Sequence, residues 1–157
     1  MRISVTDRCN FRCMYCMPAR GMVWLDKDKI LSFEEIARLA KIFSGLGVSK
    51  IRLTGGEPLM RKELHVLVRM LAGIEGVRDI SLTTNGYFLG EQAGALSDAG
   101  LNRINVSLDS LRSDSFAAIT RRSYYEKVMR GIAEAARTRL RPIKLNVVLI
   151  RLSLIHI

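Results

Sequence analysis

The chain has 157 residues, of which 48% are hydrophobic and 25% are charged, and its formal net charge is +10. This apolar content is typical of one folded domain with a substantial core, and it excludes a disordered chain. Three cysteines are too few for a disulfide scaffold. No apolar run approaches the roughly 18 residues of a membrane span, and no cleavable signal region opens the chain, so we expect a cytoplasmic protein.

The excess positive charge is concentrated toward the C-terminal end. Between Arg121 and Arg151, nine Lys or Arg residues face only two Glu residues. A solvated helix face is the simplest explanation, and an anionic small-molecule substrate or a missing acidic neighbour are the alternatives. Aromatic residues do not interleave with the basic ones beyond Tyr124 and Tyr125, which disfavours nucleic-acid binding.

Strand patterns and helix patterns alternate along the chain. Short apolar or β-branched runs predict five strands, at residues 3–6, 50–54, 79–84, 103–108 and 143–150. Apolar residues at helical spacing predict four helices, at residues 29–47, 61–72, 89–99 and 123–138. Two capping boxes, Ser32 with Glu35 and Ser123 with Glu126, mark the starts of the first and last of these helices.

The alternation of strands and helices predicts right-handed βαβ units and a parallel sheet. The strands read as continuous apolar runs, which is typical of a sheet covered on both faces. Polar or glycine-bearing turns follow the strands at residues 54–57, 83–86 and 107–109, where parallel folds place their chemistry. Five strands are too few for a closed barrel, so the sequence leaves open a doubly wound sheet or an incomplete barrel.

All three cysteines lie directly after the first strand. Cys9, Cys13 and Cys16 have the spacing C-x3-C-x2-C, which allows three thiolates to converge on one centre. A structural zinc site needs four ligands, and the only histidines, His65 and His156, are far along the chain. A disulfide fits a cytosolic chain poorly and leaves one thiol over. A four-iron cluster on three thiolates keeps one iron open to a small molecule that carries an amine and a carboxylate.

This cysteine spacing, with the aromatic Tyr15 before the last cysteine, resembles the signature of the radical S-adenosylmethionine superfamily. The turn 55–58, Gly-Gly-Glu-Pro, resembles the turn in which that superfamily receives the methionine amino group of S-adenosylmethionine. The resemblance implies an α/β fold, an incomplete (partial TIM-type) βα barrel with parallel strands. It also implies a [4Fe-4S] cluster held by Cys9, Cys13 and Cys16, with S-adenosylmethionine as the second cofactor.

Longer strings narrow the resemblance to one family, at residues 4–18, 51–61, 82–86, 103–109 and 144–148. Together they resemble the GTP 3′,8-cyclases, lyases that catalyse the first step of molybdenum cofactor (molybdopterin) biosynthesis. The resemblance implies that a 5′-deoxyadenosyl radical takes the C3′ hydrogen of GTP. C3′ then bonds to guanine C8, which gives 3′,8-cyclo-7,8-dihydro-GTP.

The same resemblance implies roles for individual residues. The positions that contact S-adenosylmethionine are Tyr15, Gly56 and Ser107. The positions that contact GTP are Arg2, Arg52, Thr83 and Lys144. No catalytic residue is assigned beyond the cluster and the cofactor.

Structural roles are the alternatives at each of these positions. They are a salt bridge for Arg52, an edge lysine for Lys144, an exposed terminus for Arg2, a core aromatic for Tyr15, and ordinary strand-end hydroxyls for Thr83 and Ser107. A further group of polar residues is expected to hold turns or line the barrel mouth without a catalytic role: Asn85, Asn105, Asp109 and Asn146. Glu57 is expected to bond nearby backbone.

The chain also departs from the family. The family carries a second [4Fe-4S] cluster bound by three further cysteines, and no cysteine follows Cys16. We therefore expect residues 1–151 to be the N-terminal part of a radical SAM core that is weakly active or inactive alone. Residues 152–157 read as an atypical tail foreign to the family. Arg121 and Arg139 stand where glycine is expected near helix boundaries.

The implied partners follow from the family. They are GTP as substrate, an electron donor such as flavodoxin or ferredoxin, and the next enzyme of the pathway, cyclic pyranopterin monophosphate synthase. Neither nucleic acid nor a membrane is expected, and a homodimer is left open. The alternatives are another radical SAM enzyme, such as a peptide-modifying maturase, or a non-catalytic metal-binding or RNA-binding module.

Overall fold

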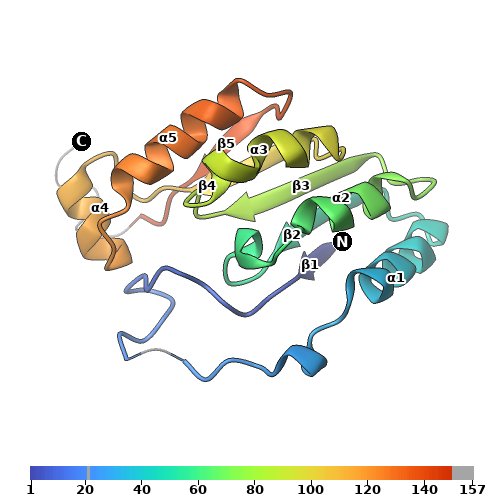
Figure 1. Cartoon of the computed structure of the whole chain (residues 1–157), viewed down its shortest axis with the longest axis horizontal. Coiled ribbons are helices and arrows are strands. Elements are labelled where there is room, and N and C mark those ends of the chain that lie inside the picture. The colour runs from blue at the N-terminus through green and yellow to red at the C-terminus, as the bar shows by residue number, and fades with distance from the viewer. Residues whose placement is uncertain (21, 150–157) are drawn as a thin grey trace.

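The computed structural model describes residues 1–20 and 22–149. Strands and helices alternate along this part of the chain (Figure 1). The strands are β1 (Arg2–Ser4), β2 (Lys50–Thr54), β3 (Asp79–Thr84), β4 (Arg103–Ser107) and β5 (Ile143–Asn146). The α-helices are α1 (Phe33–Gly45), α2 (Leu64–Ala72), α3 (Leu89–Asp98), α4 (Ser113–Thr120) and α5 (Tyr125–Ala136). Two short 3-10 helices are η1 (Lys27–Lys29) and η2 (Pro58–Met60).

The sheet is parallel throughout, with the strand order β1-β2-β3-β4-β5. Since each right-handed crossover steps to the next strand in the same direction, the connecting helices share one face of the sheet. Helix α1 contacts α2, α2 contacts α3, and α3 contacts α5, so they form a layer beside the sheet (Figure 1). A doubly wound sheet would reverse its strand order, so this topology is the expected incomplete barrel.

The strands alternate between apolar and polar side chains, and the prediction of continuous apolar runs was wrong. In β2, Ile51 and Leu53 are buried and Arg52 lies between them; in β4, Ile104 and Val106 are buried on either side of Asn105. The apolar set packs under the helices because only one face of the sheet is covered by them. The other face, the inner face of the partial barrel, therefore carries polar side chains from every strand.

Element boundaries agree with the sequence where the local signals are strong. Strands β2 and β3 have the predicted limits, and the capping box at Ser32 and Glu35 forms in both directions. The prediction of a second capping box at Ser123 and Glu126 was wrong, because the residue that precedes α5 is Tyr124 and its side chain makes no capping hydrogen bond. Helix α4 was missed, because its eight residues bury only Phe116, Ile119 and Thr120 and show no extended apolar stripe.

The predictions for the C-terminal end of the chain can be compared with the structure only in part. Strand β5 ends at Asn146, earlier than the predicted limit. Residue 150 and the atypical tail 152–157 lie outside the described residues.

The basic segment behaves largely as a solvated helix face. Three of its basic side chains pair with carboxylates: Lys127 with Glu91 at 2.7 Å, Arg137 with Glu134 at 2.8 Å, and Arg139 with Asp98 at 3.4 Å. These pairs are partly or fully solvated, so each contributes little to stability. Within the described residues, no helix is both long enough and apolar enough to cross a membrane.

Candidate active site at the carboxyl end of the sheet

The cysteines lie on a long irregular segment between β1 and η1, residues 5–20 and 22–26, which we call the cysteine loop (Figure 1). Its anchor is Phe11, which is only 2% exposed. The Phe11 ring packs edge-on against Phe116 of α4, with ring centroids 5.8 Å apart, and lies 5.9 Å from the ring of Tyr124. Offset aromatic contacts of this kind fix both position and orientation, so Phe11 holds the loop against α4.

Backbone hydrogen bonds join the same two segments. The amide of Arg12 donates to the carbonyl of Thr120 at 3.1 Å, and the amide of Met14 donates to the carbonyl of Ile119 at 2.9 Å. These carbonyls belong to the last turn of α4, which leaves such groups without partners inside the helix. The helix that the sequence pattern did not reveal therefore supports the cysteine-bearing loop.

Two arginines of the basic segment also hold the cysteine loop. Arg122 Nε donates to the carbonyl of Asn10 at 2.9 Å, and Arg121 Nη1 donates to the carbonyls of Arg12 and Met17 at 3.4 and 3.3 Å. Arg121 has a φ of 55°, in the left-handed region that favours glycine. The family expectation of glycine thus reflects the backbone conformation, and in this chain the arginine side chain binds loop carbonyls.

The turn after β2 forms the floor beneath the start of the cysteine loop. Gly56 donates its amide to the carbonyl of Thr6 at 2.8 Å, and Glu57 donates to the carbonyl of Arg8 at 2.7 Å. A Cβ atom on Gly55 or Gly56 would lie 2.4 Å from a backbone oxygen of this segment. Both glycines are therefore needed for close approach, and the approaching group is the protein's own backbone.

Glu57 is fully buried at the centre of this arrangement. Its carboxylate accepts hydrogen bonds from the amide of Leu59 at 3.0 Å, the hydroxyl of Thr84 at 2.7 Å and the amide of Asn85 at 2.6 Å. Burial raises the pKa of Glu57 to about 7, while these three donors act in the opposite direction. The expectation that Glu57 bonds nearby backbone is confirmed, and its bonds tie the ends of β2 and β3 together.

Asn85 extends the network to the first cysteine. Its Oδ1 accepts from the amide of Tyr87 at 3.1 Å, and its Nδ2 donates to Asn10 Oδ1 at 2.8 Å. The same Nδ2 lies 3.9 Å from Cys9 Sγ. The expected turn-holding role of Asn85 is confirmed, and through Asn10 it also positions the cysteine loop.

The three thiols are free, with Cys9 and Cys13 half-buried and Cys16 exposed. The amides of Cys16 and Met17 both donate to the carbonyl of Cys13 at 3.0 Å, which folds this end of the loop into a tight turn. Burial raises the pKa of the Cys13 thiol to about 12, and the charge of a Cys16 thiolate adds to this effect. Burial also raises the pKa of Cys9.

The thiols fit an iron–sulfur cluster better than a single ion. Among residues 1–20 and 22–149, no three His, Cys, Asp or Glu side chains lie close enough to hold one metal ion. In a four-iron cluster each thiolate binds a separate iron, so the sulfur atoms need not meet at one point. Cys9, Cys13 and Cys16 lie on one loop, and the bonds of the Cys16 and Met17 amides to the Cys13 carbonyl fold its end into a turn, so three free thiols are available to such a cluster.

Tyr15 is 41% exposed, so its alternative as a core aromatic was wrong. Its hydroxyl donates to Asp109 Oδ2 at 2.7 Å, and Asp109 Oδ1 accepts from the amide of Val148 at 3.0 Å. Partial burial, followed by the bond to Asp109, raises the pKa of Tyr15, which keeps the phenol neutral. Tyr15 is thereby fixed over the carboxyl ends of β4 and β5.

The polar side chains of the inner face form rows across the strands. Nearest the carboxyl ends, Ser107 pairs with Asn146. In the next row, Thr83 pairs with Asn105, which pairs with Lys144. Because side chains on one face recur every second residue, successive rows lie about 7 Å apart along a strand.

A third row, near the amino ends of the strands, is rich in arginine. Arg2 pairs with Arg52, Arg52 with Ser81, and Ser81 with Arg103. All four residues predicted from the resemblance to contact GTP, Arg2, Arg52, Thr83 and Lys144, are thus brought to the inner face in the second and third rows. Ser107 and Tyr15 lie above them, toward the carboxyl ends of the strands, where Gly56 also lies.

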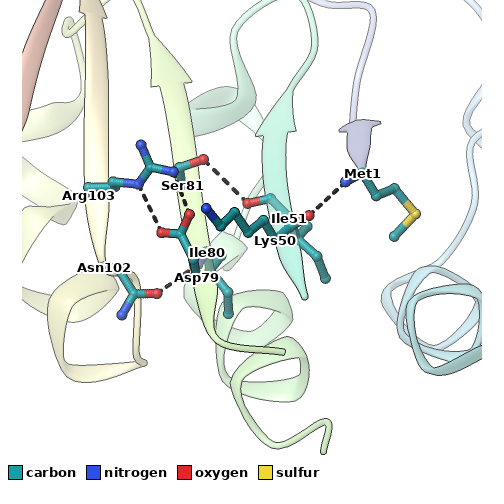
Figure 2. A network of polar contacts seen from close by, with 8 residues as sticks. All are labelled: Met1, Lys50, Ile51, Asp79, Ile80, Ser81, Asn102 and Arg103. Carbon is teal, nitrogen blue, oxygen red and sulfur yellow. Dashed lines mark hydrogen bonds and ion pairs between the residues drawn. The ribbon is translucent and has the colours of Figure 1, made fainter. Parts of the chain in front are cut away.

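The arginine row lines a pocket of ≈ 370 Å³ that also includes Lys50 and Asp79. Arg103 binds Asp79 through two hydrogen bonds, and the hydroxyl of Ser81 is satisfied by the carbonyl of Ile51 at 3.3 Å (Figure 2). At the same end of the sheet, Asn102 Oδ1 accepts from the amide of Ile80, and the Met1 nitrogen donates to the carbonyl of Lys50 (Figure 2).

Within the described residues, neither Arg2 nor Arg52 forms a close ion pair, and of the salt-bridge alternative for Arg52 only a longer-range attraction to Asp79 is present. Four basic side chains and one carboxylate line the pocket, which leaves it strongly positive. Guanidinium groups bind phosphate oxygens in pairs, so an anionic ligand suits this pocket. Lys144 is exposed on β5 and matches its alternative as an edge lysine equally well.

Comparison with known proteins agrees with this arrangement. The model of the radical SAM superfamily matches residues 3–153. The chain belongs to the radical SAM superfamily. It is 54% identical over 151 residues to the GTP 3′,8-cyclase of Moorella thermoacetica and 52% identical over 151 residues to that of Listeria monocytogenes. These matches cover 96% of this chain and 47% and 45% of the two relatives, so the chain spans about half of their length.

Solved structures support the fold. HydG, a maturase of the [FeFe]-hydrogenase, superimposes with a TM-score of 0.74 at 14% identity. The match covers 94% of this chain and 34% of the HydG chain. Methylornithine synthase (PylB) superimposes with a TM-score of 0.73 at 15% identity. The match covers 93% of this chain and 43% of the PylB chain. At such low identities the likeness shows the partial barrel alone.

Replacing Gly56 tests the floor beneath the cysteine loop. Gly56→Ala forces a Cβ atom against the carbonyls of Asp7 and Arg8, so we expect a loss of about 1–3 kcal/mol in unfolding free energy. Gly94→Ala is the matched control, because its Cβ meets nothing within 4 Å and a mid-helix alanine stabilises by about 0.5–1 kcal/mol. Urea unfolding measures both, and a Gly56→Ala protein as stable as the wild type contradicts the assignment.

Glu57 gives the protein a characteristic dependence on pH. Its pKa is raised in the folded state, from 4.5 to about 7, so its contribution to stability is fully present below pH 4.5 and lost as pH rises through 7. The difference in unfolding free energy between wild type and Glu57→Gln should change by about 3 kcal/mol across this range. If the unfolding free energy of Glu57→Gln runs parallel to that of the wild type across the pH range, the prediction is refuted.

Proposed function

We propose that this chain forms the cluster-binding and cofactor-binding part of a GTP 3′,8-cyclase, the radical enzyme that begins molybdenum cofactor biosynthesis. The observation that carries the proposal is the positive pocket on the inner face, two rows below the strand ends that face the cysteine loop. Relatives that are about half identical to this chain bear the same name, which supports the choice of GTP.

Cys9, Cys13 and Cys16 hold the [4Fe-4S] cluster in this proposal. The cluster supplies the single electron needed to cleave S-adenosylmethionine reductively. Tyr15, Gly56 and Ser107 contact the S-adenosylmethionine. Tyr15 is fixed by Asp109, Gly56 lies in the turn under the loop, and Ser107 ends β4 on the inner face.

GTP enters from the inner face and lies below the cofactor. Arg2 and Arg52 bind its phosphate oxygens, because neither forms an ion pair in the described part of the chain, whereas Arg103 is paired with Asp79. Thr83 and Lys144 contact the nucleoside from the row above. The ribose would then lie between the phosphate pocket and the cysteine loop, with C3′ toward the level at which Tyr15, Gly56 and Ser107 would hold S-adenosylmethionine.

Further predictions belong to the same proposal. Residues 1–151 form the N-terminal part of the radical SAM core, and the family's second cluster has no cysteine ligands after Cys16 in this sequence. A flavodoxin or ferredoxin supplies the electron, and cyclic pyranopterin monophosphate synthase takes the product.

Anaerobic reconstitution with iron and sulfide tests the cofactor assignment. We expect about four irons per chain and a paramagnetic spectrum that changes when S-adenosylmethionine is added. Cys13→Ser should lose most of this iron, whereas Ser123→Ala, a control outside the loop, should retain it. A well-folded wild-type protein that binds only zinc contradicts the proposal.

Replacing Arg52 tests the choice of GTP over a peptide substrate. Arg52→Gln removes one phosphate-binding charge, so we expect GTP to bind about tenfold more weakly by calorimetry, a loss of about 1.4 kcal/mol. Arg69→Gln, an exposed substitution on α2, removes the same charge without touching the pocket and should leave the affinity unchanged. Equal losses in both variants would indicate nonspecific attraction to the basic chain.

A further inference from the structure

Asn105 has a buried oxygen atom that nothing in the described structure satisfies. The residue is only 4% exposed, and its Oδ1 has no hydrogen-bond partner. Buried polar atoms are nearly always paired, because leaving one unpaired carries a desolvation penalty without compensation. The fold therefore gains nothing from the Asn105 carbonyl oxygen, and its place on the inner face needs another explanation.

Thr83 presents a second unpaired atom beside it. Thr83 Oγ1 is buried without a partner and is directly opposite Asn105 across the pairing of β3 with β4. Side chains at directly paired positions have Cβ atoms about 5 Å apart. Two neighbouring polar atoms that bond neither each other nor any other group mark one small subsite for an external group.

The chemistry of the two atoms selects the kind of group. Asn105 Oδ1 can only accept a hydrogen bond, whereas the Thr83 hydroxyl can donate or accept. A phosphate oxygen has no hydrogen to offer Asn105. Lys144, which pairs with Asn105 on the other side, disfavours an ammonium group. A neutral hydroxyl can donate to Asn105 and accept from Thr83, so it satisfies both atoms at once.

The position of the subsite agrees with a sugar. Arg103 lies one row deeper on the same strand and Ser107 one row nearer the carboxyl end, each about 7 Å away. The subsite therefore lies between the phosphate pocket and the level assigned to the cofactor. A nucleoside whose phosphates reach the arginine row would bring its ribose to this level.

We propose that Asn105 and Thr83 together bind a ribose hydroxyl of a nucleoside ligand, with Asn105 as the acceptor. This inference rests on the proposed function, which brings two nucleosides to the inner face, S-adenosylmethionine and GTP. Both carry ribose hydroxyls, so the chemistry is shared and the source is decided by experiment.

The test measures ligand affinity and thermal stability in the same reconstituted protein. Asn105→Leu keeps the approximate shape of the side chain but removes the acceptor. We expect one ligand, S-adenosylmethionine or GTP, to bind about tenfold more weakly, with a melting temperature no lower than that of the wild type. Thr83→Val should weaken binding of the same ligand. Agreement between the two variants shows that the loss of affinity does not come from a folding defect in one of them.

Thr138→Val is the control. Thr138 lies just after α5, away from the inner face, and its hydroxyl already donates to the carbonyl of Ala135 at 2.7 Å. The loss of this bond should lower the melting temperature and leave both affinities unchanged, the opposite of the result at Asn105.

If GTP is the affected ligand, 2′-deoxy-GTP and 3′-deoxy-GTP locate the hydroxyl. The wild type should bind one of them about tenfold more weakly than GTP, and Asn105→Leu should bind that analogue and GTP alike. Unchanged affinity for both nucleosides in Asn105→Leu overturns the inference while leaving the proposed function intact. A cluster-loaded wild type that binds neither nucleoside overturns both together.

Discussion

A single buried carboxylate, Glu57, connects the parts of this molecule that must act together. It lies in the turn after β2, accepts bonds from the turn after β3, and its own amide reaches the start of the cysteine loop. Asn85 carries the connection on to Asn10 and Cys9. A charge inside a protein is tolerated only when donors surround it, so the position of Glu57 dictates the conformation of three separate turns.

The inner face owes its character to the one-sided covering of the sheet. The helices bury the apolar side chains of each strand. The polar side chains remain on the inner face in rows, with hydroxyls and amides near the carboxyl ends of the strands and guanidinium groups near the amino ends. The sequence already contains this alternation in Lys50 to Thr54 and Arg103 to Ser107. In strands this short, one or two polar residues among apolar neighbours are easily read as exceptions, although they occupy every second position.

Local signals predicted the strands and helices well, whereas the contacts that assemble the site depend on tertiary structure. The limits of β2 and β3 and the capping box at Ser32 follow from neighbouring residues, and the structure confirms them. Helix α4 has no stripe of its own, because it is stabilised by Phe11, more than a hundred positions away. The site residues taken from the resemblance remain predictions, although the fold brings the four substrate positions to one face. The unpaired state of Asn105 needed both the cross-strand register and its burial to become visible.

The anchoring of the cysteine loop has a consequence for how the chain matures. Each βα unit is built from contacts close in sequence, but the bonds from Arg121 and Arg122 to the loop span 109 and 112 positions. Local contacts form quickly and distant ones late, so the loop docks only after α4 and the following turn exist. Cys9, Cys13 and Cys16 therefore reach their final positions only when the chain as far as Arg122 has been made, although they are among its first residues.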